Sequence, residues 1–343
     1  MPLVVDTIME LVSSVGSYFL RCDINSVAKM NHLILKHSWN WQKKGLLISP
    51  PSNKEDGSHA TMPFALRKSD ENEVEIYYSM RDPKSRSKIY SRAGLIENDR
   101  IQIDPVSKLI LEPGELGSFD DSGVIPSWIV RTDKNELFLY YIGVQLGVTV
   151  PFSFQIGLAI SLDGGKTFER HSRAPILGRT PASPILSTAP CVLLENGLWR
   201  MWYVSGVKWE NRDDGLRHYY LIKYAESENG LDWKQHEDAA IDFEGPDEYA
   251  LARPCVIRDN DGYWMWFAKR GEKYRMALAF SSDGIAWERI DQQVGIEVGP
   301  DDWDSQSIEY AHVFKLRDRW AMLYNGNNYG QTGVGYAFSN FPK

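Results

Sequence analysis

The stretch Ala-Ile-Ser-Leu-Asp-Gly at residues 159–164 decides the fold, because close versions of it return at a regular interval along the chain. Ala-Glu-Ser-Glu-Asn-Gly occupies residues 225–230, Ala-Phe-Ser-Ser-Asp-Gly occupies residues 279–284, and shorter versions surround two further serines. The five serines are 70, 66, 54 and 58 residues apart: Ser91, Ser161, Ser227, Ser281 and Ser339. A motif that returns at intervals of this size indicates one structural unit used several times.

A second series of residues runs through the chain with the same period. It consists of four prolines, with an alanine in the fifth place, at spacings of 63, 64, 64 and 57: Pro63, Pro126, Pro190, Pro254 and Ala311. We call this residue the repeat proline, the alanine included, and count neighbouring positions from it. Two motif series in the same order and at the same period indicate five copies of one unit.

Each copy has the pattern of four β-strands. A strand carrying the repeat proline (58–66) is followed by an aromatic strand (264–267 in the fourth copy) and a small-residue strand (156–160 in the second). A Ser-x-Asp/Asn-Gly turn then leads to a fourth strand. The pattern predicts an all-β protein, with a five-bladed β-propeller over residues 37–343.

The ends of a propeller must be joined, because an open ring leaves unpaired strand edges. A strand pattern at residues 41–48 precedes every repeat, whereas the last copy stops after its third strand near Phe341. We therefore expect residues 41–48 to complete the last blade.

Residues 1–36 lie outside the repeat. They contain an apolar stretch, 11–20, which is too short to span a bilayer and follows Asp6 and Glu10 instead of a positively charged segment. We expect a short helical extension here and no membrane insertion.

The composition and net charge indicate which classes of partner the protein is expected to bind. Aromatic residues make up 12% of the 343 residues, which suits β structure, and the net charge of −8 comes without a basic tract, so no nucleic-acid partner is expected. Cys191 and Cys255 each follow a repeat proline, which predicts buried free thiols, a reducing compartment and hence a cytoplasmic location. Cys22 is the thiol that we expect to react.

The sequence has no residue spacing typical of a metal site, and we expect no cofactor. The oligomeric state stays open.

Asp163, in the stretch quoted first, resembles part of the Asp-box of sialidases. Asn229 and Asp283 take its place in two other copies. A hairpin cap explains all three residues, so we interpret Asp163 as structural.

The candidate site follows from the geometry of a propeller, whose innermost strands line a central channel. The repeat-proline strands and the ends of the aromatic strands carry acidic, basic, amide and aromatic residues. The candidates for catalysis are Asp121, Glu309, Asp82 and Glu248. The candidates for binding substrate are His59, Asp120, Arg253, Lys269, Arg270, Tyr249, Tyr310 and Asn325.

Glycoside hydrolysis needs a protonated acid and a second, ionised carboxylate. We interpret Asp121 as the base or nucleophile and Glu309 or Glu248 as the acid, and we expect Asp121, Arg253 and Glu309 to share one cavity. Strand alternation puts Asp121 and Arg253 on one side and Glu309 on the other, so Glu309 needs a bulge, which the change to Ala311 makes possible. For each residue a turn-capping or blade-tying role stays open, and for His59 a role as proton shuttle or ligand to a channel cation as well.

With these residues in view, the chain resembles the five-bladed glycosidase superfamily over about residues 39–340. That group includes arabinanases, β-xylosidases, invertase-type enzymes and mannoside phosphorylases, and the chain looks most like bacterial glycosidase-like proteins of uncertain activity. The stretches that carry the resemblance are 119–127, 199–206, 222–227, 252–257 and 323–327. The resemblance implies a saccharide or sugar-conjugate substrate.

The chain departs from the superfamily's catalytic pattern. His59 stands where the first Asp is expected, Gln306 stands where the closer relatives have an acidic residue, and the third inner strand carries no carboxylate. Three functions therefore stay open. One is a glycosidase; another is a phosphorylase with Lys269, Arg270, Arg253 and His59 around a phosphate; the last is a carbohydrate-binding propeller without catalysis.

Overall fold

The computed structural model describes residues 39–68, 70–300 and 303–340, which belong to one compact unit, Trp39–Phe341. The predicted helical extension (1–36) and Cys22 lie outside the described residues.

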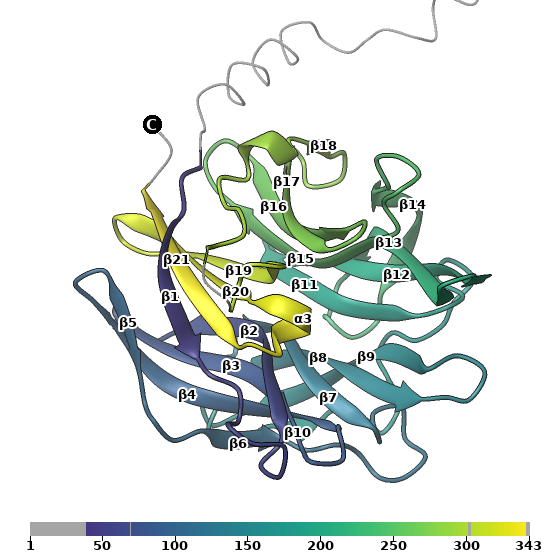
Figure 1. Ribbon diagram of the computed structural model, residues 1–343, viewed down its shortest axis with the longest axis horizontal. Helices are drawn as coiled ribbons and strands as arrows, with labels where there is room; N and C mark the ends of the chain where they lie inside the picture. Colours follow the sequence, from purple (N-terminus) through teal and green to yellow (C-terminus); the bar gives the residue numbers. More distant parts are fainter. Residues whose placement is uncertain (1–38, 69, 301–302, 341–343) are drawn as a thin grey trace, which may run out of the picture. The chain divides into compact units, whose positions relative to one another are not determined.

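The described strands form three sheets, of four, nine and eight strands (Figure 1). The two larger sheets each consist of two antiparallel groups joined by one parallel bridge, Ser87 with Gly123 and Tyr220 with Ala250, so there are five groups, one for each copy of the repeat. Group one contains β2 (Ser58–Arg67), β3 (Glu73–Arg81) and β4 (Ser87–Glu97), with β5 (Arg100–Ile103) and β6 (Lys108–Leu111) paired to β4. Group two contains β7 (Gly123–Arg131), β8 (Leu137–Leu146), β9 (Phe152–Ser161) and β10 (Glu169–Arg170).

The remaining groups repeat this order. Group three contains β11 (Ser187–Glu195), β12 (Leu198–Arg212), β13 (Gly215–Ser227) and β14 (Lys234–Ile241). Group four contains β15 (Ala250–Arg258), β16 (Tyr263–Arg270), β17 (Tyr274–Ser281) and β18 (Glu288–Arg289), followed by the 3-10 helix η1 (Asp291–Gln293). Group five contains β19 (Glu309–Lys315), β20 (Arg319–Asn325), the short segment α3 (Asn327–Gly330), β21 (Val334–Asn340) and β1 (Gln42–Ile48).

The first described strand, β1, closes the last group. β1 pairs antiparallel with β21, with Leu46 opposite Gly335. This confirms the prediction that residues 41–48 complete the final group, so that sequence-distant ends of the unit are held together by backbone hydrogen bonds.

The five repeat-proline strands form a closed ring around the centre of the unit (Figure 1). β2 lies against β7, β7 against β11, β11 against β15, β15 against β19, and β19 against β2. Residues at one position of the repeat contact the next strand in all five cases, so the strands meet at the same level there.

One residue from each strand, directly after the repeat proline, contacts the next strand. Four of these contacts are polar: Ser127 Oγ donates to Pro190 O (2.7 Å), Cys191 Sγ accepts from Val256 N (3.2 Å), Cys255 Sγ accepts from Val313 N (3.1 Å), and His312 Nε2 meets Ala65 O (3.2 Å). The fifth is aromatic, with the Phe64 and Trp128 ring centroids 5.2 Å apart. All five side chains are buried, so they fill the centre of the ring at this level.

The two thiols are free and buried, as the sequence predicts. Burial raises the pKa of the Cys255 thiol to about 11 and holds that of the Cys191 thiol well above its ordinary value. Their role is to satisfy backbone groups between neighbouring inner strands.

Each inner strand is bulged at the repeat proline. Pairing with the neighbouring strand shifts register there in all five groups: between Thr61 and Phe64, Pro126 and Trp128, Thr188 and Cys191, Ala252 and Cys255, and Glu309 and His312. The bulge expected only at Ala311 therefore belongs to the repeat itself, and the substitution of proline by alanine is not its cause.

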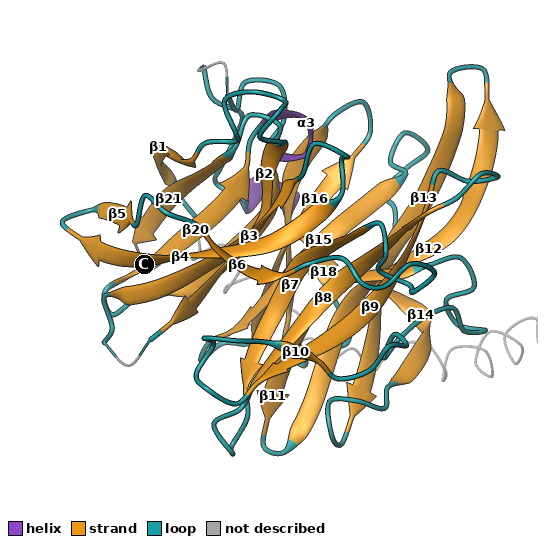
Figure 2. Cartoon of the chain, turned by 90° about the horizontal axis from the view of Figure 1, so that it is seen from below, coloured by secondary structure: helices purple, strands orange, loops and turns teal. Residues whose placement is uncertain are grey.

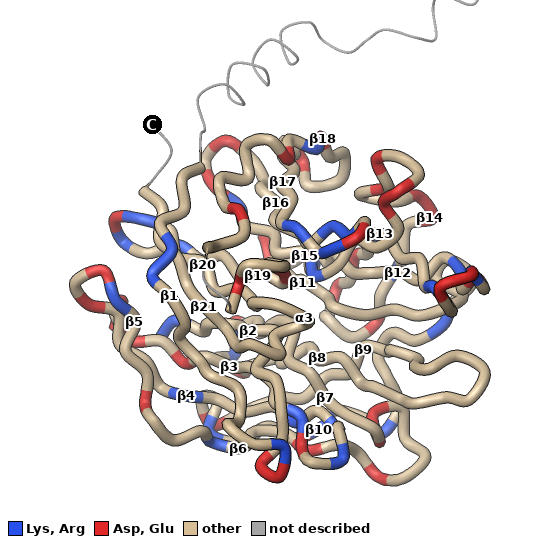
Figure 3. Tube along the Cα trace, in the orientation of Figure 1, with Lys and Arg blue, Asp and Glu red and all other residues tan. Residues whose placement is uncertain are grey.

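Charged residues are mostly kept away from this ring. In Figure 3 most Lys, Arg, Asp and Glu lie in the outer loops, and the strands near the centre are mostly without them. Figure 2 shows the long β12–β13 hairpin extending beyond the neighbouring strands at the end where α3 lies. That end holds the candidate site.

Candidate functional site

A cavity of about 340 Å³ opens at the end of the ring where the inner strands begin. The residue directly before the repeat proline lines it in all five strands: Met62, Ile125, Ala189, Arg253 and Tyr310. This size suits a small molecule or part of a larger one. One position of the repeat thus supplies a different side chain from each group to the same cavity.

Four of these five residues have left-handed backbone conformations. Their φ angles are +54° for Met62, +47° for Ala189, +51° for Arg253 and +59° for Tyr310. Such angles cost a side chain other than glycine roughly 1–3 kcal/mol and concentrate at functional sites. Four around one cavity therefore support its selection as the site.

The other lining residues divide by group. Groups two and three supply mostly apolar side chains, together with Thr188, His218 and Tyr220: Ile142, Phe152, Phe154 and Val204. Groups one and five supply Arg81 at the end of β3 and Tyr329 in α3. No Asp or Glu is among the lining residues, all of which lie in the described ranges. The cavity is therefore apolar on one side and cationic on the other.

Arg81 is half-buried and makes no hydrogen bond or ion pair through its side chain with any described residue. Burial lowers its pKa, and the nearby phenols of Tyr310 and Tyr329 oppose that shift. Burial, with a contribution from Arg81, also lowers the pKa of His59 to about 4, so His59 is neutral at pH 7.

Arg253 is fully buried without an acidic partner among the described residues. Its guanidinium donates to Pro63 O at 2.9 Å and meets Met62 Sδ at 3.4 Å, while Nε has no partner there. Burial lowers its pKa to about 10. A buried charge without a counter-charge is costly. Because the pKa of Arg253 is still well above 7, its guanidinium nevertheless stays positively charged at neutral pH.

Glu309, at the start of β19, lies beside the cavity rather than in its wall. Its side chain is 0% exposed; Oε1 accepts the Tyr329 backbone N–H at 2.5 Å, and Oε2 has no partner among the described residues. Burial raises its pKa to about 8, despite the Tyr329 hydrogen bond and the charge of Arg270. Glu309 therefore keeps its proton at neutral pH.

Arg270, at the end of β16, lies against three tyrosines near Glu309. Its guanidinium carbon is 5.4, 5.2 and 5.6 Å from the ring centroids of Tyr249, Tyr274 and Tyr329, and it donates to the Tyr329 hydroxyl. Arg270 and Glu309 line a pocket of about 40 Å³ that shares Tyr329 with the cavity. Tyr329 thus borders both the pocket of the acid and the larger cavity.

Asp120 and Asp121, predicted as site residues, lie in the turn before β7 and line neither pocket. Asp121 accepts from Gly117 N (2.9 Å) and Ser122 Oγ (2.8 Å). Asp120 is buried and accepts from Arg170 Nε (2.8 Å) and the Tyr141 hydroxyl (3.0 Å). The predicted grouping of Asp121 with Arg253 and Glu309 in one cavity is not what the structure shows, because Asp121 stands five positions before the proline, outside the bulged segment.

Asp82 and His59 have local contacts. Asp82 accepts from the Lys84 and Arg86 backbone N–H groups and from the Arg86 guanidinium. Although burial opposes it, these Arg86 interactions hold the pKa of Asp82 below its ordinary value. The His59 Nδ1 lies 2.9 Å from Ser58 Oγ. These are the contacts of turn and strand residues.

Glu248 and Lys269 belong to an ion-pair cluster apart from the cavity. Arg289 pairs with Glu248 at 2.7 Å and with Asp291 at 2.6 Å, and Lys269 Nζ pairs with Asp291 at 2.6 Å. We call these four residues the closed cluster. Lys269 and Arg270 are adjacent in β16, so alternation sends them to opposite faces of the sheet.

Three further predicted residues lie near the cavity. Tyr310 lines it. Tyr249 stacks with Arg270 and with Arg217, whose guanidinium carbon is 4.7 Å from its ring centroid. Asn325 is buried, accepts from Met62 N (3.0 Å) and donates to Thr61 Oγ1 (2.6 Å), so it supports the bulge that presents Met62.

Sequence reasoning placed Arg253 and Tyr310 on the inner strands and Arg81 at the end of an aromatic strand, where the structure has them, but it did not single out Phe152, Phe154, His218 or Tyr329. One signal in the sequence could have located the cavity: the residue directly before the repeat proline differs in type from copy to copy, and in all five copies it lines the cavity. Arg81 carries a different signal, its place at the end of an aromatic strand, whereas Tyr329 carries neither, since it lies in α3 between two strands.

The Asp-box turns are caps, as interpreted. Asp163 accepts from the hydroxyls of Ser161 and Thr167 and from two backbone N–H groups of its turn. Asp283 accepts in the same way from Ser281 Oγ and two backbone N–H groups.

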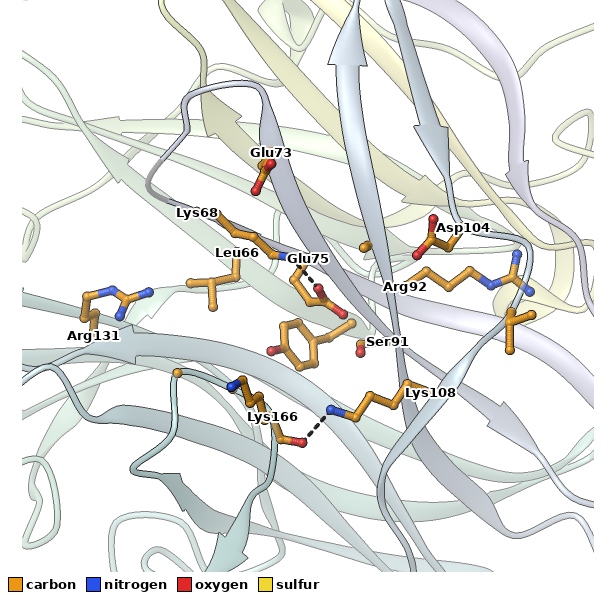
Figure 4. A pocket seen from close by; sticks show the side chains of 15 residues that line it. Leu66, Lys68, Glu73, Glu75, Ser91, Arg92, Asp104, Lys108, Arg131 and Lys166 are labelled. Atoms are coloured by element: carbon orange, nitrogen blue, oxygen red, sulfur yellow. Dashed lines mark hydrogen bonds and ion pairs between the residues drawn. The ribbon is translucent and has the colours of Figure 1, made fainter.

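A larger depression, of about 570 Å³, lies at the opposite end of groups one and two (Figure 4). Leu66, near the end of β2, and Arg131, at the end of β7, contribute to it, together with the Asp-box turn. Within it Lys68 pairs with Glu75 (3.0 Å), and Lys108 Nζ donates to Lys166 O (2.6 Å). Because these charges are met by neighbours, we place the candidate site at the cavity instead.

Within the described ranges, no group of three His, Cys, Asp or Glu residues could hold a metal ion. No helix there is long and apolar enough to cross a membrane.

No family model matches the chain. Two relatives from Mycobacterium tuberculosis do: the uncharacterized protein MT1551 of strain CDC 1551 / Oshkosh is 41% identical over 300 residues, covering 87% of this chain and 98% of its own length. The uncharacterized protein Rv1502 of strain ATCC 25618 / H37Rv is 40% identical with the same coverage. This protein belongs to the family of these two mycobacterial proteins.

Solved structures share the fold at low identity. A structure of a BT0996 RGII complex superposes with a TM-score of 0.69 at 15% identity, covering 92% of this protein and 98% of the other. A putative glycoside hydrolase from Parabacteroides distasonis ATCC 8503 gives 0.64 at 13%, covering 88% and 96%. A structure from the GH130 family of mannoside phosphorylases, which contains glycoside hydrolases that target β-1,2 mannosidic linkages in Candida mannan, gives 0.65 at 13%, covering 88% and 94%. The resemblance to propeller glycosidases is therefore confirmed as a likeness of fold.

Proposed function

We propose that the five strand groups are the blades of a five-bladed propeller and that the protein cleaves or transfers a glycosidic bond of a saccharide or sugar conjugate at the cavity. The likeness to glycoside hydrolase and mannoside phosphorylase structures supports the reaction class. The observation that carries the proposal is Glu309, a buried carboxyl that keeps its proton at neutral pH next to a cavity lined by all five repeats.

Glu309 has the properties of a general acid. Its pKa of about 8 leaves the proton in place at pH 7 yet allows its transfer to the oxygen that leaves the sugar. Its Oε2 has no partner among the described residues, its Oε1 accepts the Tyr329 backbone N–H, and Tyr329 lines the cavity as well. Because Glu309 is 0% exposed, contact with a substrate requires a neighbouring side chain, such as that of Tyr329, to move.

The nucleophile distinguishes two reactions. Hydrolysis by the usual route needs a second, ionised carboxylate near the first, and no carboxylate is among the described residues that line the cavity. Phosphorolysis needs only the acid: a phosphate oxygen bonds to the anomeric carbon as the glycosidic bond breaks, and the leaving oxygen takes the Glu309 proton. Arg81 favours this second route, because guanidinium groups bind phosphate well, and the fully buried Arg253 adds positive charge nearby.

The roles predicted for Asp121, Asp82 and Glu248 stay predictions. The contacts of each carboxylate explain it without catalysis. Asp121 and Asp82 each accept hydrogen bonds within a turn, and Glu248 belongs to the closed cluster.

The test is turnover of an oligosaccharide panel with and without inorganic phosphate, with products separated by chromatography. We expect a sugar 1-phosphate that forms only with phosphate, and a loss of about 10²–10⁴-fold in Glu309→Gln. Glu75→Gln, which changes a carboxylate of the opposite depression, is the matched control and should keep full turnover. Loss of turnover in Asp121→Asn, with Glu309→Gln fully active, would contradict the proposal.

Binding without catalysis is the second candidate, because the Glu309 side chain is 0% exposed. An oligosaccharide that binds but stays intact after long incubation, with or without phosphate, would support it.

A further inference from the structure

The two sides of the cavity differ because of the order of groups in the ring. Groups two and three are neighbours and supply the apolar side chains, whereas groups four, five and one are neighbours and supply Arg253, Tyr310, Tyr329 and Arg81. A ligand that fills the cavity meets both sides at once.

The apolar side is built from aliphatic and aromatic groups in contact. The Phe152 and Phe154 rings are stacked, with centroids 4.5 Å apart and planes 13° apart, and Phe152 also meets the edge of Trp209 at 5.0 Å. Ile125, Ile142 and Val204 complete this side. Stacked rings and branched aliphatic groups favour an apolar partner.

The cationic side has charge that the described residues do not neutralise. Arg81 has no side-chain partner there, and the guanidinium of Arg253 meets only a carbonyl and a thioether. Since no Asp or Glu of the described ranges lines the cavity, a bound anion would supply the missing counter-charge. Charge-assisted hydrogen bonds from guanidinium to an oxyanion are among the strong ones in proteins.

A neutral sugar ring alone fits this interior poorly, so in the proposed reaction the sugar lies on the Glu309 side and the non-sugar part of the conjugate fills the cavity. The hydroxyls of a sugar are usually met by carboxylates and amides, and neither kind of side chain is among the described lining residues. The polar groups apart from the arginines are the Thr188 hydroxyl, the His218 ring and the tyrosine hydroxyls.

We propose that the cavity binds an oxyanion joined to an apolar group, with the oxyanion at Arg81 and the apolar group against Phe152, Phe154 and Ile142. The oxyanion is a carboxylate or a phosphate ester, which share this chemistry. As a statement about substrate the inference rests on the proposed function, in which this group is the non-sugar part of a sugar conjugate. As a statement about binding it needs no turnover.

The test is calorimetric titration of the full chain with small probes. Phenyl phosphate and phenylacetate carry both features, 2-phenylethanol lacks the charge, inorganic phosphate lacks the ring, and glucose 1-phosphate replaces the ring by a sugar. We expect phenyl phosphate, phenylacetate or both to bind at least about tenfold more tightly than the other three. The better of the two identifies the oxyanion.

Two variants test whether the probe binds in the cavity. Arg81→Gln should weaken binding of the better probe about tenfold, and Phe152→Ser should weaken it without changing binding of inorganic phosphate. Arg131→Gln, an exposed arginine of the opposite depression, is the matched control and should change nothing.

Equal binding of 2-phenylethanol or glucose 1-phosphate to the wild-type protein would overturn the inference, whatever the variants do. An unchanged affinity in a folded Arg81→Gln would overturn it as well. Because these titrations need no reaction, tight probe binding without sugar turnover leaves the inference standing and removes only the proposed function.

Discussion

The closed cluster and the surroundings of the cavity differ in how their charges are paired, although the end of strand β16 contributes to both: Lys269 to the cluster and Arg270 to the small pocket beside the cavity. In the closed cluster Arg289 meets Glu248 and Asp291, and Lys269 meets Asp291. Around the cavity, Arg81 and Arg253 have no acidic partner among the described residues, and the nearby carboxyl of Glu309 holds a proton. The first arrangement is complete without a ligand. The second becomes complete only when an anion is supplied, which is the difference expected between a structural and a functional set of charges.

The largest effect is expected inside the closed cluster. The Arg289 side chain is 7% exposed, so Arg289→Met leaves Glu248 and Asp291 without their main partner. The free energy of unfolding should fall by about 3 kcal/mol or more, as measured by urea denaturation, with probe binding in the cavity unchanged. A variant as stable as the wild type would show that the cluster is not a structural unit.

The next effect is the dependence of stability on pH at Glu309. The folded protein keeps a proton up to a pKa of about 8 that the unfolded protein loses near 4.5, so this contribution to stability is full below pH 4.5 and lost by about pH 8. The free energy of unfolding of the wild type, relative to Glu309→Gln, should fall by about 1.4 kcal/mol per pH unit across that window. Parallel pH profiles of the two proteins would mean that Glu309 is ionised in the fold.

A smaller change in stability is expected for Arg253→Met, although Arg253 is the more deeply buried arginine. Removing a buried charge that has no counter-charge relieves its desolvation cost, so the free energy of unfolding should change by less than about 1 kcal/mol or rise. The same urea denaturation measures it. A loss as large as that of Arg289→Met would erase the distinction between the two regions.

The smallest effects should separate the neighbours on β16. Lys269→Met should lower the free energy of unfolding by less than about 1 kcal/mol, because Asp291 keeps Arg289 and Lys269 is one-third exposed. Arg270→Met should leave stability similar but raise the pKa of Glu309, because the charge of Arg270 lowers that pKa, and should reduce turnover by weakening the acid. Turnover at several pH values measures both variants, and equal turnover in the two would place Arg270 outside the site.

The sequence allowed the fold to be predicted at the level of strands and their order. The repeat prolines placed the inner strands, and the strand left over at residues 41–48 indicated how the last group closes, which the pairing of Leu46 with Gly335 confirms. Both inferences rest on local sequence patterns, and each repeat of these patterns forms one group of strands in the folded protein.

Predicting the side of a strand on which a residue lies was less successful. Plain alternation put Asp121 with Arg253 and excluded Glu309, whereas the structure has a bulge in all five inner strands and places Glu309 next to Tyr329. A bulge adds one residue to one strand of a pair, so every parity counted across it changes.

By itself, the sequence determined the repeat, the inner strands, and the buried positions of Cys191 and Cys255, because strand periodicity and turn chemistry act between near neighbours in the chain. Only the tertiary structure decided which charges are neutralised. Arg289 and Glu248 are 41 residues apart in the chain and form an ion pair. Arg253 and Pro63 are 190 residues apart and are hydrogen-bonded, but this contact gives Arg253 a carbonyl group and no carboxylate. Charge compensation depends on distances between separate groups of strands, and one-dimensional spacing does not contain those distances.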